Sequence, residues 1–98
     1  MRAFYIYNNP ILGEIYLQER CDWKNRVSFR DITGLVDYLN SDEPLSKTLR
    51  ERGKIAIHLS GDLVGDLEEA LKKVSFKKQP KIERGEPPKQ EISDSSSD

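Results

Sequence analysis

The stretch that most restricts the fold is residues 54–74, where a strand-like segment, a glycine turn and a helix-like segment follow one another. In residues 55–59 isoleucine and leucine alternate with alanine and histidine, which is typical of a strand with one buried face. Gly61 ends this strand, and Ser60 or Asp62 is expected to cap the next helix. The helix itself is predicted from one apolar stripe at three- and four-residue spacing: Leu63, Val64, Leu67, Ala70, Leu71 and Val74.

Two more alternating segments, residues 2–8 and 11–18, come earlier and are separated by the turn-forming sequence Asn-Asn-Pro. Because so short a connection joins neighbouring antiparallel strands, the two segments predict a hairpin. The alternation divides all three strands into two faces. The side chains expected to face the helices are Phe4, Ile6, Ile11, Ile15, Leu17, Ile55, Ile57 and Leu59.

Residues 28–40 are predicted to form a helix that begins with a capping-box-like motif at Ser28. Residues 41–52 are predicted to hold a short helix, because Pro44 suits a first helical position. Residues 19–27, before the first of these helices, are expected to be a loop with a tryptophan anchor.

The chain changes character at residue 76, after which prolines and serines leave few apolar side chains to bury. Residues 1–75 are therefore predicted to be a single small domain, and residues 76–98 a disordered charged tail. The predicted fold class is α+β. It consists of a small three-stranded sheet (the N-terminal antiparallel hairpin plus a third strand) packed on two main helices and one short helix.

Charge and composition argue against several classes of function and cellular location. The formal net charge is −1 and the sequence pI is about 5.9, which argues against a broad electrostatic grip on nucleic acid. The one cysteine, Cys21, allows no internal disulfide and fits a reducing compartment. No apolar run is long enough to span a bilayer, so we expect a cytoplasmic protein without membrane contact.

No catalytic or metal-binding signature is present in the sequence. A nucleophile–base pair would need the only histidine, His58, beside Cys21 or a serine, and nothing in the sequence brings them together. One histidine and one cysteine also fall short of the usual zinc ligand set. We therefore expect no enzyme activity, no metal site and no cofactor.

The clearest candidate for a binding surface follows from the strand alternation. If the inner residues face the helices, then Tyr5, Tyr7, Tyr16 and His58 share the opposite sheet face. Such a face can bind a partner, because aromatic residues dominate interface hot spots. The alternative is that the Trp23 loop or residues 41–52 cover this face, since tyrosine is also a common strand residue.

These observations favour a small non-catalytic interaction or regulatory protein. It would bind a protein partner, or a second copy of itself, through the aromatic sheet face or a sheet edge. One alternative is weak binding of single-stranded nucleic acid by the same tyrosines, with possible tail contacts from Lys77, Lys78 and Lys81. Another is an accessory subunit of an enzyme whose site is completed by a second chain.

Overall fold

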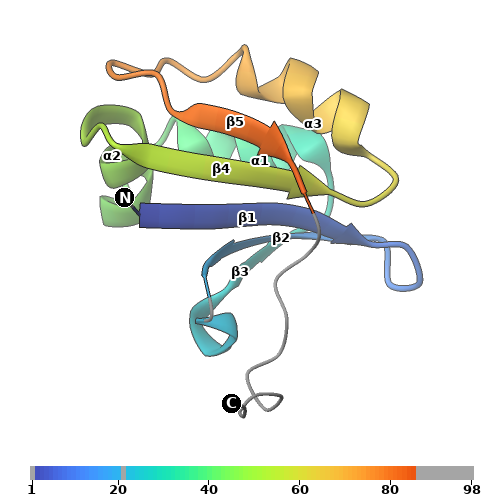
Figure 1. Ribbon diagram of the computed structural model, residues 1–98. Coiled ribbons are helices and arrows are strands. Elements are labelled where there is room, and N and C mark those ends of the chain that lie inside the picture. Colours follow the sequence, from blue (N-terminus) through green and yellow to red (C-terminus); the bar gives the residue numbers. More distant parts are fainter. Residues whose placement is uncertain (1, 21, 86–98) are drawn as a thin grey trace, which may run out of the picture.

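The computed structural model describes residues 2–20 and 22–85, which form one mixed sheet and a layer of helices (Figure 1). The strands are β1 (Arg2–Asn9), β2 (Glu14–Glu19), β3 (Val27–Phe29), β4 (Ile55–Ser60) and β5 (Lys81–Arg84). The helices are α1 (Ile32–Leu39), α2 (Pro44–Glu51) and α3 (Val64–Leu71), with a 3-10 turn, η1, at Trp23–Asn25. None of the described helices is long and apolar enough to cross a membrane.

The prediction of a three-stranded sheet is wrong, because the described residues form five strands in the order β3-β2-β1-β4-β5. The central strand β1 is antiparallel to β2 and parallel to β4. The two unexpected strands, β3 and β5, lie at the two edges of the sheet and pair with the hydrogen-bonding edges of β2 and β4. Both also bring an apolar side chain, Phe29 and Ile82, against the core.

The position of β5 corrects the prediction that disorder begins at residue 76. Residues 76–85 are described, Phe76 packs against the core, and β5 extends the sheet. The rest of the predicted tail, residues 86–98, lies outside the described residues, as does Cys21.

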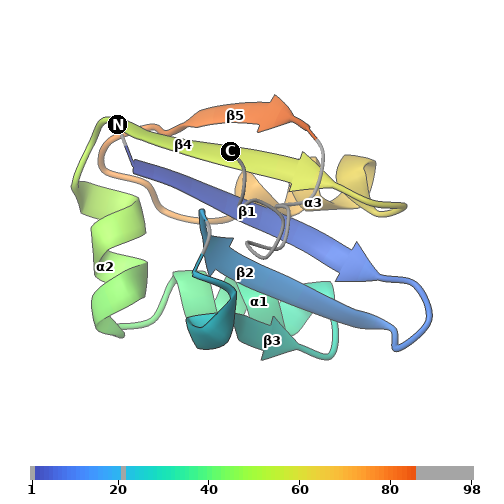
Figure 2. The ribbon, with the colours of Figure 1, turned by 60° about the horizontal axis from the view of Figure 1, so that its bottom comes forward.

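The core lies between the sheet and the helices. In the view of Figure 2, α1 and α3 lie behind the sheet, and α2 lies beside it at the left. Every second side chain of the central strands points toward them, as the alternation predicted, and almost no part of these side chains is exposed. The buried strand residues are Phe4, Ile6, Ile15, Leu17, Ile55, Ile57 and Leu59.

Ile11 is the exception among the residues expected to face the helices, since 91 % of it is exposed. The chain does not enter β2 at residue 11 but completes a turn first. In this turn the Asn9 side chain accepts hydrogen bonds from the backbone N–H groups of Ile11 and Leu12. Gly13 then takes a positive φ of 75°, which glycine adopts without steric cost. The turn therefore uses three residues, 11–13, that were expected to belong to the strand.

The first helix also begins later than predicted, and Asp31 rather than Ser28 caps it. The Asp31 carboxylate accepts a hydrogen bond from the backbone N–H of Gly34 at 2.8 Å. Ser28 instead lies opposite Tyr16 in the ladder between β2 and β3. Ser28 and Phe29, which the capping pattern assigned to the first helical turn, therefore belong to β3 and pair with β2.

Replacing Asp31 with alanine is expected to lower the free energy of unfolding by about 1 kcal/mol, because an N-terminal donor of α1 loses its partner. Ser28→Ala is the matched control, since Ser28 is exposed and caps no helix, and it should change stability by less than about 0.5 kcal/mol. Urea denaturation followed by circular dichroism measures both. A larger loss for Ser28→Ala than for Asp31→Ala would contradict this assignment of the cap.

Candidate functional site

The four aromatic residues predicted to share one sheet face do so. Tyr5 lies opposite His58 across the β1–β4 pair, and Tyr7 lies opposite Tyr16 across the β1–β2 pair. This face is the one turned away from the three helices, and it is seen directly in Figure 2. We call these four residues the aromatic face; they form a band across β2, β1 and β4.

Tyr5 and His58 are stacked, with ring centroids 4.9 Å apart and ring planes inclined by 22°. On its other side His58 is bordered by β5. The His58 Nδ1 atom lies 3.7 Å from a carboxylate oxygen of Glu83, which makes an ion pair when the imidazole is protonated. The backbone of Gly85 also passes close, because a Cβ atom placed there would lie 3.6 Å from Nδ1. The edge strand that the sequence did not reveal therefore frames one end of the aromatic face.

Tyr7 and Tyr16 form the other half of the band, with ring centroids 5.4 Å apart and planes inclined by 51°. The Tyr7 hydroxyl donates a 2.7 Å hydrogen bond to Gln18, and the Tyr16 hydroxyl donates to Glu14 at 2.9 Å. Burial raises the pKa of Tyr7, and the positive charge of Arg26 opposes this shift. The hydrogen bond to Glu14, together with burial, raises the pKa of Tyr16. Both hydroxyls are therefore protonated at neutral pH and can act as hydrogen-bond donors.

The four rings are not equally accessible. Only 5 % of Tyr16 is exposed, and the Arg26 guanidinium lies 4.4 Å from the centroid of its ring. Tyr5, Tyr7 and His58 are half-buried. Tyr16 therefore packs against the Tyr7 ring and the Arg26 guanidinium. The other three aromatic residues supply most of the exposed area of the aromatic face.

The lysines that the sequence suggested as tail contacts fall in two places. The backbone N–H groups of Lys77 and Lys78 both donate to the Arg50 carbonyl at the end of α2, so these residues adjoin the helical layer. Lys81 belongs to β5 and lies beside the aromatic face, with its ammonium 3.1 Å from Glu83. The three lysines do not form one basic surface next to the tyrosines.

Two kinds of reactive site, a serine nucleophile at Ser60 and a metal site, lack their required partners in the described residues. The Ser60 hydroxyl is buried and has no hydrogen-bond partner there, whereas a nucleophilic serine needs a bonded base. Within residues 2–20 and 22–85 no group of three or more histidine, cysteine, aspartate or glutamate side chains is placed to hold a metal ion. Cys21, the other candidate nucleophile, lies outside the described residues.

Four polar residues at the aromatic face were not among the predicted site residues: Glu14, Gln18, Arg26 and Glu83. The alternation of β2 already places Gln18 on this face, so this residue could have been found. Glu83 carried no signal because its segment resembles a disordered tail in composition. The approach of Arg26 to Tyr16 depends on η1 and β3, which the sequence pattern did not predict.

Comparison of the chain with known protein families, curated proteins and solved structures found no match. The function is therefore inferred from the chain's own surface.

Proposed function

We propose that this chain is a non-catalytic interaction protein that binds a partner protein through the aromatic face. The observation that carries the proposal is that aromatic rings from three adjacent strands meet on the sheet face opposite the described helices. Tyrosine offers a large apolar area together with a polar hydroxyl, and it is enriched among the residues that dominate binding energy. The partner is expected to present an apolar patch with hydrogen-bonding groups at its rim.

The charges around the aromatic face favour a protein over single-stranded nucleic acid. Glu14 and Glu83 border the rings at opposite ends of the band, and Arg26 and Lys81 lie beside the same rings, so these four charges sum to zero and give no positive surface for phosphates. The cations that a nucleic-acid surface would need are divided, since Lys77 and Lys78 adjoin α2. The net charge of −1 adds no general attraction for a polyanion.

Replacing Tyr5 and Tyr7 together with alanine is expected to weaken partner binding by at least about thirtyfold, because the loss of even one hot-spot aromatic side chain costs about 2 kcal/mol or more. The partner is first captured from native extract on the immobilised full-length chain and then purified. Its affinity for the wild-type chain and the double variant is measured by isothermal titration calorimetry, after thermal unfolding has shown that the variant is folded.

The matched control is the double variant Thr33→Ala/Asp37→Ala, which changes two exposed positions of α1 in the helical layer. It should bind the partner with wild-type affinity. Equal affinity of the tyrosine variant and the wild-type chain would reject the aromatic face as the binding surface. Binding of single-stranded RNA or DNA that the tyrosine substitutions abolish, with no captured protein, would replace the proposal with the nucleic-acid alternative.

A further inference from the structure

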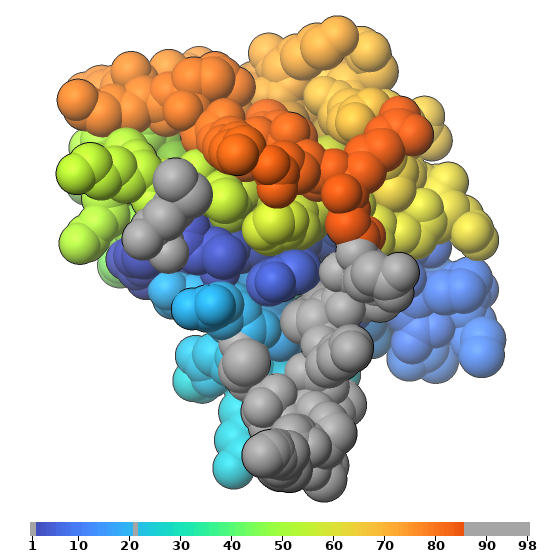
Figure 3. All heavy atoms as spheres, in the orientation of Figure 1, coloured from blue at the N-terminus to red at the C-terminus, as the bar shows by residue number. Residues whose placement is uncertain are grey.

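The chain leaves the edge strand β5 beside the aromatic face. Gly85 follows β5, its N–H donates to the Leu59 carbonyl of β4 at 2.9 Å, and its backbone passes close to the His58 ring. Figure 3 shows β5, β4 and β1 side by side at the surface of the molecule. Residues 86–98 follow in the sequence and lie outside the described residues. This segment therefore starts at one end of the aromatic face.

The segment is long enough to cross the whole aromatic face. From β5 to β3 the sheet has four strand spacings of about 4.8 Å each, which give about 19 Å. A chain in the polyproline II conformation rises about 3.1 Å per residue, so about six residues cover this distance. Glu91 is the sixth residue after Gly85, and residues 92–98 come after it. The second half of the segment can therefore reach β2 and β3.

The start of the segment suits the aromatic rings. Pro87 and Pro88 are the second and third residues after Gly85, so a segment that crosses the sheet would bring them over β4 and β1. These strands carry the half-buried rings of His58 and Tyr5. Consecutive prolines favour the polyproline II conformation, and proline-rich segments bind surfaces lined with aromatic side chains. The two prolines therefore come at the positions where the segment would meet these two rings.

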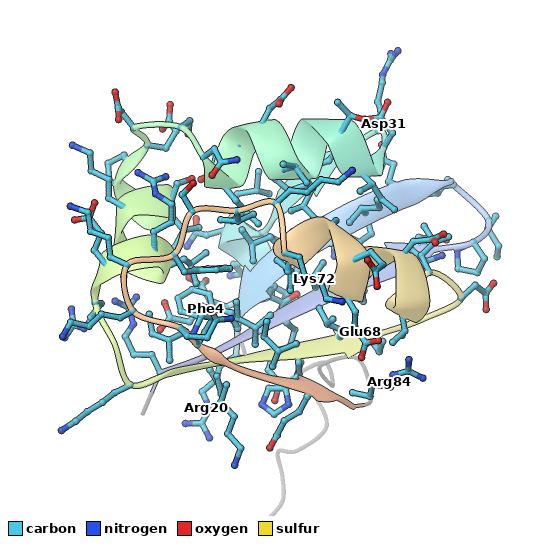
Figure 4. All side chains as sticks on the ribbon, turned by 90° about the horizontal axis from the view of Figure 1, so that it is seen from above. Phe4, Arg20, Asp31, Glu68, Lys72 and Arg84 are labelled. Atoms are coloured by element: carbon cyan, nitrogen blue, oxygen red, sulfur yellow. The ribbon has the colours of Figure 1, made fainter. Side chains whose placement is uncertain are left out.

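The second half of the segment is opposite in charge to the side of the aromatic face farthest from β5. On that side the Arg26 guanidinium lies 4.4 Å from the centroid of the Tyr16 ring, and Figure 4 shows Arg20 pointing away from α1 and α3. Neither guanidinium makes an ion pair within the described part of the chain. These two cations and the carboxylate of Glu14 sum to a charge of +1. Residues 90–98 have a formal charge of −3, with no lysine or arginine and three acidic residues: Glu91, Asp94 and Asp98.

The side of the aromatic face next to β5 is close to neutral, as is the part of the segment that would cover it. The Lys81 ammonium lies 3.1 Å from a carboxylate oxygen of Glu83. In the segment, Glu86 and Lys89 carry opposite charges. Each half of the segment is therefore compatible in charge with the part of the aromatic face that it would reach.

We propose that residues 86–98 bind the aromatic face of their own chain and that the partner protein must displace them. The two prolines contact His58 and Tyr5, and the acidic residues lie near the two guanidinium groups. Attachment through Gly85 gives the segment an effective concentration of about 1 mM, so a contact with a Kd of about 0.1 mM would be occupied about nine-tenths of the time. The competition with the partner rests on the proposed function, whereas the intramolecular contact does not.

The test is NMR spectroscopy of the isotope-labelled full-length chain at low salt, without a partner. The backbone order parameters of residues 90–94 are expected to exceed about 0.6, since lower values mark a flexible backbone. The proline ring protons should show nuclear Overhauser effects to the rings of Tyr5 or His58. In Glu91→Lys/Asp94→Lys the order parameters should fall below about 0.6 and these effects should be lost, because the two guanidinium groups repel the new cations.

The matched control is Asp37→Lys/Asp42→Lys, which changes the net charge by the same amount at exposed positions in α1 and in the connection after it. It should leave the order parameters of residues 90–94 at their wild-type values. Order parameters below about 0.6 in the wild-type chain, or equal values in the wild-type chain and Glu91→Lys/Asp94→Lys, would overturn the inference. Order that appears only as the protein concentration is raised would also overturn it, because the occupant would then be a second copy.

Partner affinity separates this inference from the proposed function. If the segment covers the aromatic face nine-tenths of the time, its release in Glu91→Lys/Asp94→Lys should tighten partner binding about tenfold, and the control variant should bind as the wild-type chain does. An ordered segment together with unchanged partner affinity would reject the aromatic face as the partner's site, while the intramolecular contact stands. A wild-type segment without order, together with partner binding that Tyr5→Ala/Tyr7→Ala weakens, would reject this inference and leave the proposed function standing.

Discussion

Replacing Phe4 with alanine is expected to lower the free energy of unfolding by about 3–5 kcal/mol, the usual cost of removing a buried aromatic ring and leaving a cavity. Phe4 is 0 % exposed and lies in the central strand, opposite Glu19 of β2 and Ile57 of β4. Total stabilities of small domains are about 5–15 kcal/mol, so this loss is a large fraction of the whole. Chemical denaturation followed by circular dichroism measures it, and in a domain of this size each kcal/mol shifts Tm by about 4–8 °C.

Ile11→Ala is the control for the Phe4 variant, because Ile11 is also apolar but lies exposed in the β1–β2 turn. Its stability should stay within about 0.5 kcal/mol of the wild-type value. A loss as large as that of Phe4→Ala would mean that Ile11 belongs to the core, as the sequence pattern first suggested. The pair of variants therefore tests where β2 begins.

The two faces of the central strands could be predicted from the sequence because alternation is a local property. Tyr5 and Tyr7 must oppose Phe4 and Ile6 whatever the neighbouring strands are. For the same reason His58 had to oppose Ile57. The sheet face that carries the candidate site could thus be predicted from three short segments, without knowledge of the strand order.

The edges of the sheet could not be predicted because their strands are defined by their neighbours. β3 has only three residues, too few to show alternation, and Ser28 within it belongs to a helix-capping pattern. β5 reads Lys-Ile-Glu-Arg, so it contributes a single apolar side chain, Ile82. These two segments become strands because they pair with β2 and β4. This pairing is a tertiary effect that overrides the preference of the local sequence.

Replacing Gly61 with alanine is the other substitution expected to have a large effect, lowering the free energy of unfolding by about 2–4 kcal/mol. Gly61 has a φ of +94°, a conformation that strains any residue with a Cβ atom. An added Cβ would also overlap Oδ1 of Asn8 and lie 3.3 Å from the Asn8 backbone nitrogen. The Asn8 side chain accepts from the Leu63 N–H at 3.5 Å, so displacing it also removes a link between β1 and the start of α3.

Gly65→Ala is the matched control, because Gly65 lies in α3 with a negative φ and an added Cβ would meet nothing within 4 Å. Alanine there should leave stability unchanged or raise it by up to about 1 kcal/mol, since alanine favours helix more than glycine does. Denaturant midpoints of the two variants should therefore move in opposite directions or by very different amounts. If both variants were equally stable, the close approach of the β4–α3 turn to Asn8 would be wrong, because steric overlap at Gly61 is what separates them.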